Sequence, residues 1–90
     1  MSKAHRLRIP QWVTLPFHYR VQVKQIPDSD FNEEIGADAL AGWVVEEKTI
    51  YLRSSRTLKQ RRADLAHEML HVVSDWQVEI LGSKHADVKI

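Results

Sequence analysis

The chain has 90 residues, of which 43% are hydrophobic, and its formal net charge is +1. A chain of this length is expected to form a single domain, residues 1–90, with a modest core. The small net charge excludes a global bias towards nucleic acid, and no apolar run is long enough to span a membrane. The chain contains no cysteine, so any metal must be held by histidine and carboxylate groups, and a cytoplasmic location is expected.

The first part of the chain predicts an irregular arm followed by a strand. Residues 1–16 are basic and then interrupted by prolines, which favours irregular structure. From Phe17 to Ile26, apolar and polar residues alternate, a pattern that is typical of a strand with one buried face. The positions expected to face the core are Phe17, Tyr19, Val21, Val23 and Gln25.

A hairpin and a long helix are predicted next. Residues 28–39 are acidic and rich in turn formers, which indicates a solvated loop with room for one helical turn. Residues 40–45 and 49–53 are rich in strand formers and are separated by a polar turn. No glycine or proline interrupts residues 56–76, so a helix is predicted there, with a serine at position 54 or 55 as its cap. Gly82 marks the next break.

The predicted helix contains the pattern His-Glu-x-x-His at positions 67–71. Residues four apart lie on one helix face, so His67 and His71 can aim their imidazole nitrogens at a single Zn²⁺ ion. Glu68 lies about 100° further round the helix. There it is placed beside the ion, where it can take a proton from a water that the metal activates. The pattern therefore predicts one zinc per chain with Glu68 as general base.

The rest of the helix supports this arrangement. Leu65, Met69, Val72 and Trp76 recur at helical spacing and predict a stripe that faces the core. The two histidines fall on the opposite side of the helix. A helix with its core stripe on one face and paired histidines on the other is suited to form the floor of a metal site.

Catalytic zinc normally has three protein ligands, so a further ligand is expected. His85 follows the break at residue 82 and is the first candidate, with residues 79–90 folding back over the metal face. Glu79, past the predicted helix end, is the next candidate, followed by Asp87. Asp75 lies about 12 Å along the helix axis from the first histidine, too far to share the ion. It is expected to hydrogen-bond His71 or to cap the helix end.

The His-Glu-x-x-His pattern resembles the zincin metallopeptidases. The hairpin and helix over residues 43–76 are similar to the smallest members, namely the minigluzincins, the SprT-like proteases and compact phage or bacterial metallopeptidase domains. In minigluzincins the third ligand is a glutamate on the next helix, which would correspond to Glu79. In SprT-like proteases it is a histidine further along the chain, which would correspond to His85. The resemblance also implies a sheet whose edge strand pairs with an extended substrate.

These patterns together predict an α+β fold, in which a small antiparallel sheet of about three strands packs on the long helix. The predicted function is zinc-dependent hydrolysis of peptide or protein substrates, with Tyr51 and His18 as candidate oxyanion donors. One alternative is a non-catalytic binding module stabilised by zinc, in which a fourth protein ligand closes the site. The other is association with nucleic acid through a basic cluster. The cluster comprises Arg53, Arg56, Lys59, Arg61 and Arg62.

Overall fold

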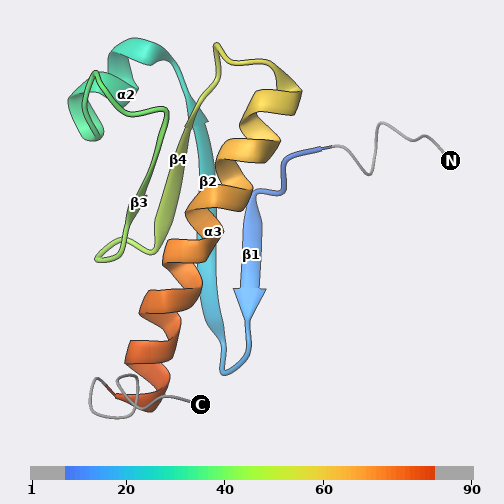
Figure 1. The fold of residues 1–90 in the computed structure, drawn as a ribbon, viewed down its shortest axis with the longest axis vertical. Helices are drawn as coiled ribbons and strands as arrows, with labels where there is room; N and C mark the ends of the chain where they lie inside the picture. The colour runs from blue at the N-terminus through green and yellow to red at the C-terminus, as the bar shows by residue number, and fades with distance from the viewer. Residues whose placement is uncertain (1–7, 83–90) are drawn as a thin grey trace, which may run out of the picture.

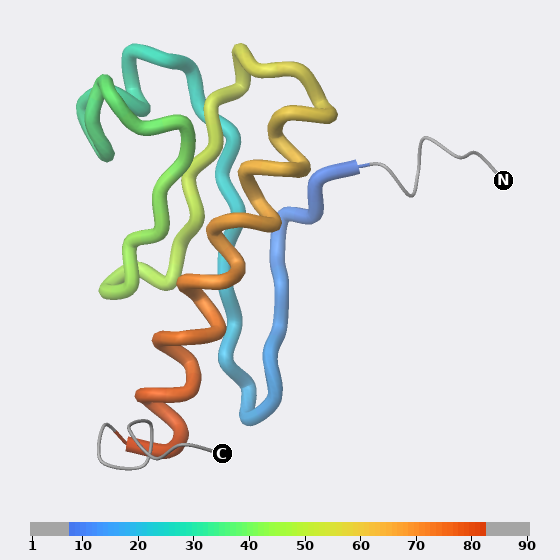
Figure 2. The backbone as a smooth tube through the Cα atoms, in the orientation of Figure 1, coloured from blue at the N-terminus to red at the C-terminus, as the bar shows by residue number. Residues whose placement is uncertain are grey.

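The computed structural model describes residues 8–82 and has an α+β fold, which confirms the predicted class. The elements within these residues are β1 (Trp12–Leu15), β2 (Tyr19–Ile26), α2 (Asp28–Glu34), β3 (Ala41–Val44), β4 (Thr49–Arg53) and α3 (Leu58–Leu81). In Figure 1, α3 runs across one face of the sheet. In Figure 2, the β1–β2 and β3–β4 turns lie towards the C-terminal end of α3, and α2 lies at the other end. Neither helix in the described part of the chain is long and apolar enough to cross a membrane.

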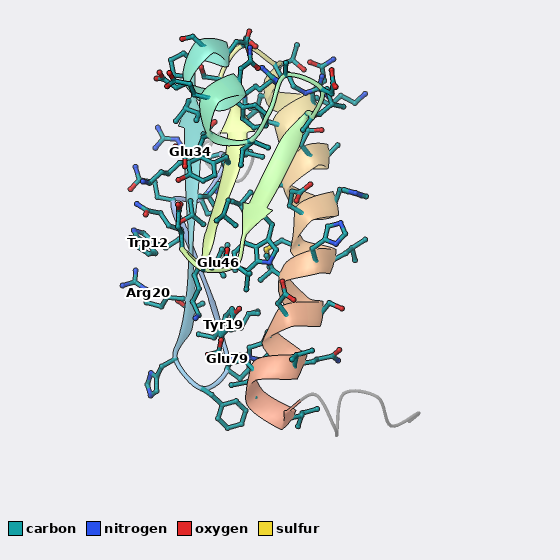
Figure 3. The ribbon with its side chains drawn as sticks, turned by 90° about the vertical axis from the view of Figure 1, so that its left-hand side faces the viewer. Trp12, Tyr19, Arg20, Glu34, Glu46 and Glu79 are labelled. Carbon is teal, nitrogen blue, oxygen red and sulfur yellow. The ribbon has the colours of Figure 1, made fainter. Side chains whose placement is uncertain are left out.

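The sheet differs from the predicted one in strand number and direction. Its four strands lie in the order β1-β2-β4-β3. Both hairpins are antiparallel, but β2 and β4 pair in parallel, with Val23 beside Ile50. The prediction of an irregular arm over residues 1–16 is wrong for β1, because the prolines at 10 and 16 flank this strand without removing a donor from it. Trp12 and Arg20 project from the sheet face opposite α3 (Figure 3).

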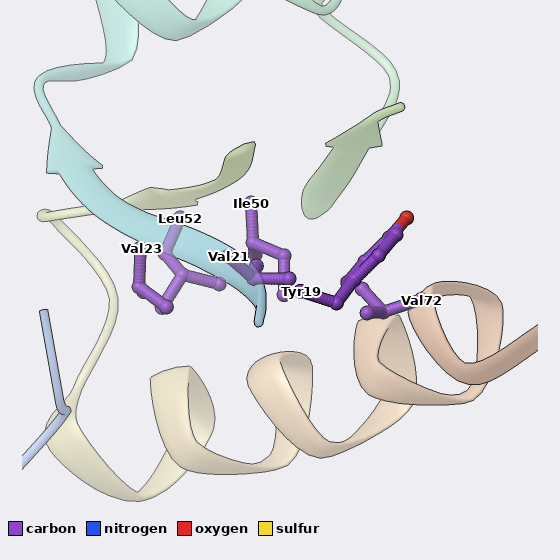
Figure 4. Packing of buried hydrophobic residues seen from close by; sticks show 6 residues of the cluster. All are labelled: Tyr19, Val21, Val23, Ile50, Leu52 and Val72. Carbon is purple, nitrogen blue, oxygen red and sulfur yellow. The ribbon is translucent and has the colours of Figure 1, made fainter. Parts of the chain in front are cut away.

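The core lies between the sheet and α3 (Figure 4). Its buried cluster consists of Tyr19, Val21, Val23, Ile50, Leu52 and Val72. The other members of the predicted helix stripe, Leu65, Met69 and Trp76, pack against this cluster, so the predicted stripe is confirmed. Phe17 and Gln25 are exposed instead of buried, because Phe17 lies in the β1–β2 turn with φ 70° and Gln25 lies near the end of β2.

Helix α3 begins later and ends later than predicted. Its N-cap is Thr57, whose hydroxyl accepts a hydrogen bond from the Gln60 amide in a capping box, in place of the predicted serine. Its end is five residues beyond Trp76, because good helix formers continue until Gly82, which adopts φ 82°. The predicted break at Gly82 is thus confirmed, whereas the predicted helix end at Trp76 is wrong.

The acidic segment after β2 forms α2 and is anchored by one arginine. Arg53 is 9% exposed, and its guanidinium lies 4.1 Å from the centre of the buried Phe31 ring. The guanidinium donates hydrogen bonds to the side chains of Asp28 and Asn32 and to the carbonyl oxygens of Gly36, Ala37 and Ala39. This anchor fixes the backbone of residues 36–39, which lead directly into β3.

Candidate metal centre and active site

The two histidines of the signature lie on the exposed side of α3, away from the core stripe. The ring centroids of His67 and His71 are 5.4 Å apart, and the ring planes are inclined by 79°. Two imidazoles bound to one tetrahedral zinc at about 2.1 Å would have centroids roughly 5 Å apart. The separation of the two ring centroids is therefore close to the one that a shared zinc ion requires.

Glu68 points to a different side of the helix from the histidines, towards β3. It is 9% exposed. Together with His67, Asp64, Leu40 and Ala41, it lines a pocket of about 420 Å³. A histidine and the acid next to it in sequence therefore border the same space, and the opposite wall of that space is the start of an edge strand.

Asp64 is a pocket residue that sequence reasoning missed. It lies one helical turn before Glu68, so the two carboxylates are on neighbouring positions of one face. The carboxylate of Asp64 accepts hydrogen bonds from Arg56 at 2.6 and 3.3 Å, and the two side chains form an ion pair. Arg56 therefore compensates the second negative charge of the pocket. The spacing from Glu68 was the signal in the sequence that could have identified Asp64.

Asp75 and Glu79 form contacts with residues other than the two histidines. Asp75 accepts a hydrogen bond of 2.6 Å from the Trp43 indole nitrogen, and it lies well inside the helix, so the predicted helix-end cap is wrong. Glu79 lies on the same helix as His71, two turns further on, or about 12 Å along the axis. Its carboxylate is 3.3 Å from the Lys48 ammonium. Because α3 does not turn back before Glu79, the helix keeps this residue away from the pair.

The described residues bring no third metal-binding side chain together with the histidine pair. Within residues 8–82, no group of three histidine or carboxylate side chains is arranged to hold a metal ion. His85 and most of the predicted covering tail, residues 83–90, lie outside the part of the chain that the structure describes. The described site thus consists of a histidine pair and a carboxylate beside a pocket.

The two candidate oxyanion donors are not in this pocket. Tyr51 alternates with the core residues Ile50 and Leu52, so its side chain lies on the sheet face opposite α3. Its hydroxyl donates a 2.6 Å hydrogen bond to Glu47, which raises the pKa of Tyr51 to about 12. His18 is exposed in the β1–β2 turn.

The basic cluster does not form one free surface. Arg53 is buried in its anchor, and Arg56 is paired with Asp64. Arg61 donates a hydrogen bond to the Arg56 carbonyl oxygen and another to Gln25. Internal contacts thus engage three of the five cationic side chains, which weakens the case for a nucleic-acid surface.

Comparison of the chain with known protein families, with curated proteins and with solved structures finds no match.

Proposed function

We propose that the protein is a zinc-dependent metallopeptidase in which His67 and His71 hold the ion and Glu68 is the general base. One observation carries the proposal, namely that His67 and Glu68 line a single pocket whose other wall begins edge strand β3. An edge strand presents backbone donors and acceptors along which an extended peptide can pair. Metal ligand, base and peptide-binding strand are therefore neighbours.

The metal, Glu68 and strand β3 have different roles in the proposed hydrolysis. When bound, zinc would supply a Lewis acid that activates water and polarises the scissile carbonyl. Glu68 accepts the proton of the attacking water and returns it to the leaving amine nitrogen. Its low exposure keeps bulk water away from the carboxylate, and pairing of the substrate with β3 brings the scissile bond to the pocket.

We assign the third ligand to His85, because a third imidazole completes a ligand set that catalytic zinc accepts and because Asp75 and Glu79 have other partners. A cytoplasmic location fits a chain without cysteine.

Metal analysis of purified variants tests the ligand assignment. The parent is expected to bind one zinc per chain, and His67→Ala, His71→Ala and His85→Ala are each expected to weaken zinc binding greatly. His18→Ala is the matched control, because this histidine is exposed and outside the pocket. If His67→Ala and His71→Ala bind as much zinc as the parent, the proposed metal site does not exist.

Hydrolysis of an unstructured peptide tests the catalytic role of Glu68. Glu68→Gln is expected to retain zinc and to lose activity by about 10²–10⁴-fold, the usual contribution of a positioned acid or base. Glu34→Gln, an exposed change on α2, should leave activity unchanged. A parent chain that binds zinc through four protein ligands and cleaves no peptide would favour the non-catalytic binding module instead.

A further inference from the structure

The β3–β4 hairpin contacts α3 along the side of the helix on which Glu68 lies. From β3, the Trp43 indole N–H donates a 2.6 Å hydrogen bond to the Asp75 carboxylate. From the β3–β4 turn, the Lys48 ammonium lies 3.3 Å from the Glu79 carboxylate, one helical turn further on. The Lys48 and Glu79 side chains are 37% and 52% exposed, whereas the Trp43–Asp75 hydrogen bond is part-buried and short, so the first contact is the stronger one.

The Trp43–Asp75 hydrogen bond lies further along α3 than the pocket does. Ala41 and Trp43 are two residues apart on β3 and both pack on the helix side of the sheet. Ala41 lines the pocket with Glu68, and Trp43 reaches Asp75, seven residues or about 10.5 Å further along the helix. His71 lies between these two contacts in the sequence of α3. The hydrogen bond from the edge strand therefore reaches α3 one helical turn beyond His71, and the pocket lies before this point along the helix.

The surroundings of this contact are largely desolvated. Trp43 and Asp75 are both half-buried, and the neighbouring Tyr19 is only 3% exposed, with a buried hydroxyl that lacks a hydrogen-bond partner among the described residues. Burial raises the pKa of Tyr19, and the negative charges of Glu79 and Asp75 raise it further. Figure 3 shows Tyr19 and Glu79 together between the sheet and α3. A hydrogen bond in such an environment is stronger than one in water.

The other face of β3 is equally confined. A Cβ atom at Gly42, between Ala41 and Trp43, would lie 2.8 Å from the Ile35 side chain. Ile35 therefore packs directly against the strand from the α2 side. The strand is held between this contact and the Trp43–Asp75 hydrogen bond, which restricts its movement towards or away from α3.

We propose that the Trp43–Asp75 hydrogen bond is a clamp that sets the separation between edge strand β3 and Glu68, which makes both residues positioning residues for the peptide substrate. This inference rests on the proposed peptidase function. A peptide paired with β3 moves with that strand, so the distance from its scissile carbonyl to Glu68 depends on the clamp. A misplacement of about 1 Å can cost about 10²-fold in rate. Asp75 thus acts on the substrate strand and not on the metal.

Trp43→Phe tests the clamp, with Trp76→Phe as its matched control. Each change removes one indole donor from a half-buried tryptophan that packs on the same core, since Trp76 donates to the Pro16 carbonyl oxygen. Trp43→Phe is expected to lower kcat/KM on an unstructured peptide by about 10–100-fold. Zinc affinity should stay within about threefold of the parent value, since the imidazole ligands are untouched. Amide hydrogen exchange in β3 should accelerate. Trp76→Phe should change neither kcat/KM nor exchange in β3.

Two changes at Asp75 separate the clamp from a role in orienting His71. Asp75→Asn keeps a carbonyl oxygen that can accept the indole hydrogen bond and should retain most of the activity. Asp75→Ala should behave like Trp43→Phe. The proposal is overturned if both tryptophan variants lose activity equally, which would make the role merely structural. It is also overturned if Asp75→Ala weakens zinc binding while Trp43→Phe leaves activity unchanged.

The same measurements distinguish failure of the clamp from failure of the proposed function. A parent chain that neither binds zinc nor cleaves peptide overturns the function, and the inferred role in positioning substrate falls with it. A parent chain that is an active zinc peptidase, combined with unchanged β3 exchange and unchanged kcat/KM in Trp43→Phe, overturns the clamp alone.

Discussion

Replacement of Arg53 by methionine should destabilise the fold more than any other change in the basic cluster. Methionine can still cover the Phe31 ring, on which the guanidinium packs at 4.1 Å, but it offers no hydrogen-bond donor. The change leaves five acceptors without this donor, namely the side chains of Asp28 and Asn32 and the carbonyl oxygens of Gly36, Ala37 and Ala39. Residues 36–39 would become less constrained, and these residues position the pocket wall at the start of β3.

The size of the effect follows from the burial of these partners. Hydrogen bonds to a charged group contribute about 1.5–3 kcal/mol each, but exposed acceptors regain water when the donor is lost. The Asp28 side chain is 53% exposed, so its loss is largely compensated. Gly36 and Ala39 are the half-buried partners, and a buried acceptor left without a donor costs about 1–3 kcal/mol, so the expected cost of Arg53→Met is roughly 2–4 kcal/mol. A chain of 90 residues has a total free energy of unfolding of roughly 5–13 kcal/mol, so the variant should be marginal.

Urea unfolding of the parent, Arg53→Met and Arg62→Met measures this cost. Arg62 belongs to the same basic cluster but is exposed, so its replacement should change the free energy of unfolding by at most about 0.5 kcal/mol. Hydrogen bonds from Arg53 and Ser55 hold the pKa of Asp28 below its ordinary value. Their stabilising effect is present above that ordinary value and is lost as pH falls, and Arg53→Met should weaken this dependence. An Arg53→Met variant within 1 kcal/mol of the parent would refute the reasoning.

Two further predictions concern the core and alkaline pH. Val72→Ala should cost about 2 kcal/mol, because a fully buried side chain loses two methyl groups, whereas Val73→Ala, at a position that is 37% exposed, should cost about 0.5 kcal/mol or less in the same unfolding assay. The folded-state pKa of Tyr51, about 12, lies above the ordinary value of 10.0, so its contribution to stability is present below pH 10 and is lost as pH rises towards 12. Tyr51→Phe should flatten this alkaline decline, and an unchanged pH profile would show that the hydrogen bond to Glu47 does not control it.

The features that the sequence predicted correctly depend on local periodicity. The burial of Val72 and the exposure of His67 both follow from the 3.6-residue period of a helix, whose phase the apolar residues define. The hairpin follows from two short runs of strand formers around a polar turn, and the structure places its strands within one residue of the predicted bounds. The end of α3 was predicted too early, because the residues between Trp76 and Gly82 are compatible with a helix and nothing there forces it to stop.

The features that were missed depend on pairing in space. β1 has only four residues, too few to show alternation, and it is stabilised by pairing with β2. The parallel register of β2 and β4 places Gln22 beside Thr49, across a connection that contains α2 and β3, and no local pattern encodes it. The partners of Asp64 and Asp75 come from other elements for the same reason. The site was thus predictable along the helix, but not across the space between helix and sheet.

The open edge of β3 has a consequence for the behaviour of the protein at high concentration. The strand Ala41–Val44 contains no charged side chain, and a flat apolar edge is a template for a strand of another copy as well as for a substrate. With a formal net charge of +1, overall repulsion between copies is weak. In the sequence, the charged residues nearest to this strand are Asp38 before it and Glu46 after it, and such flanking charges oppose strand-to-strand aggregation. These two exposed carboxylates are therefore placed to act as gatekeepers that limit self-association of the strand.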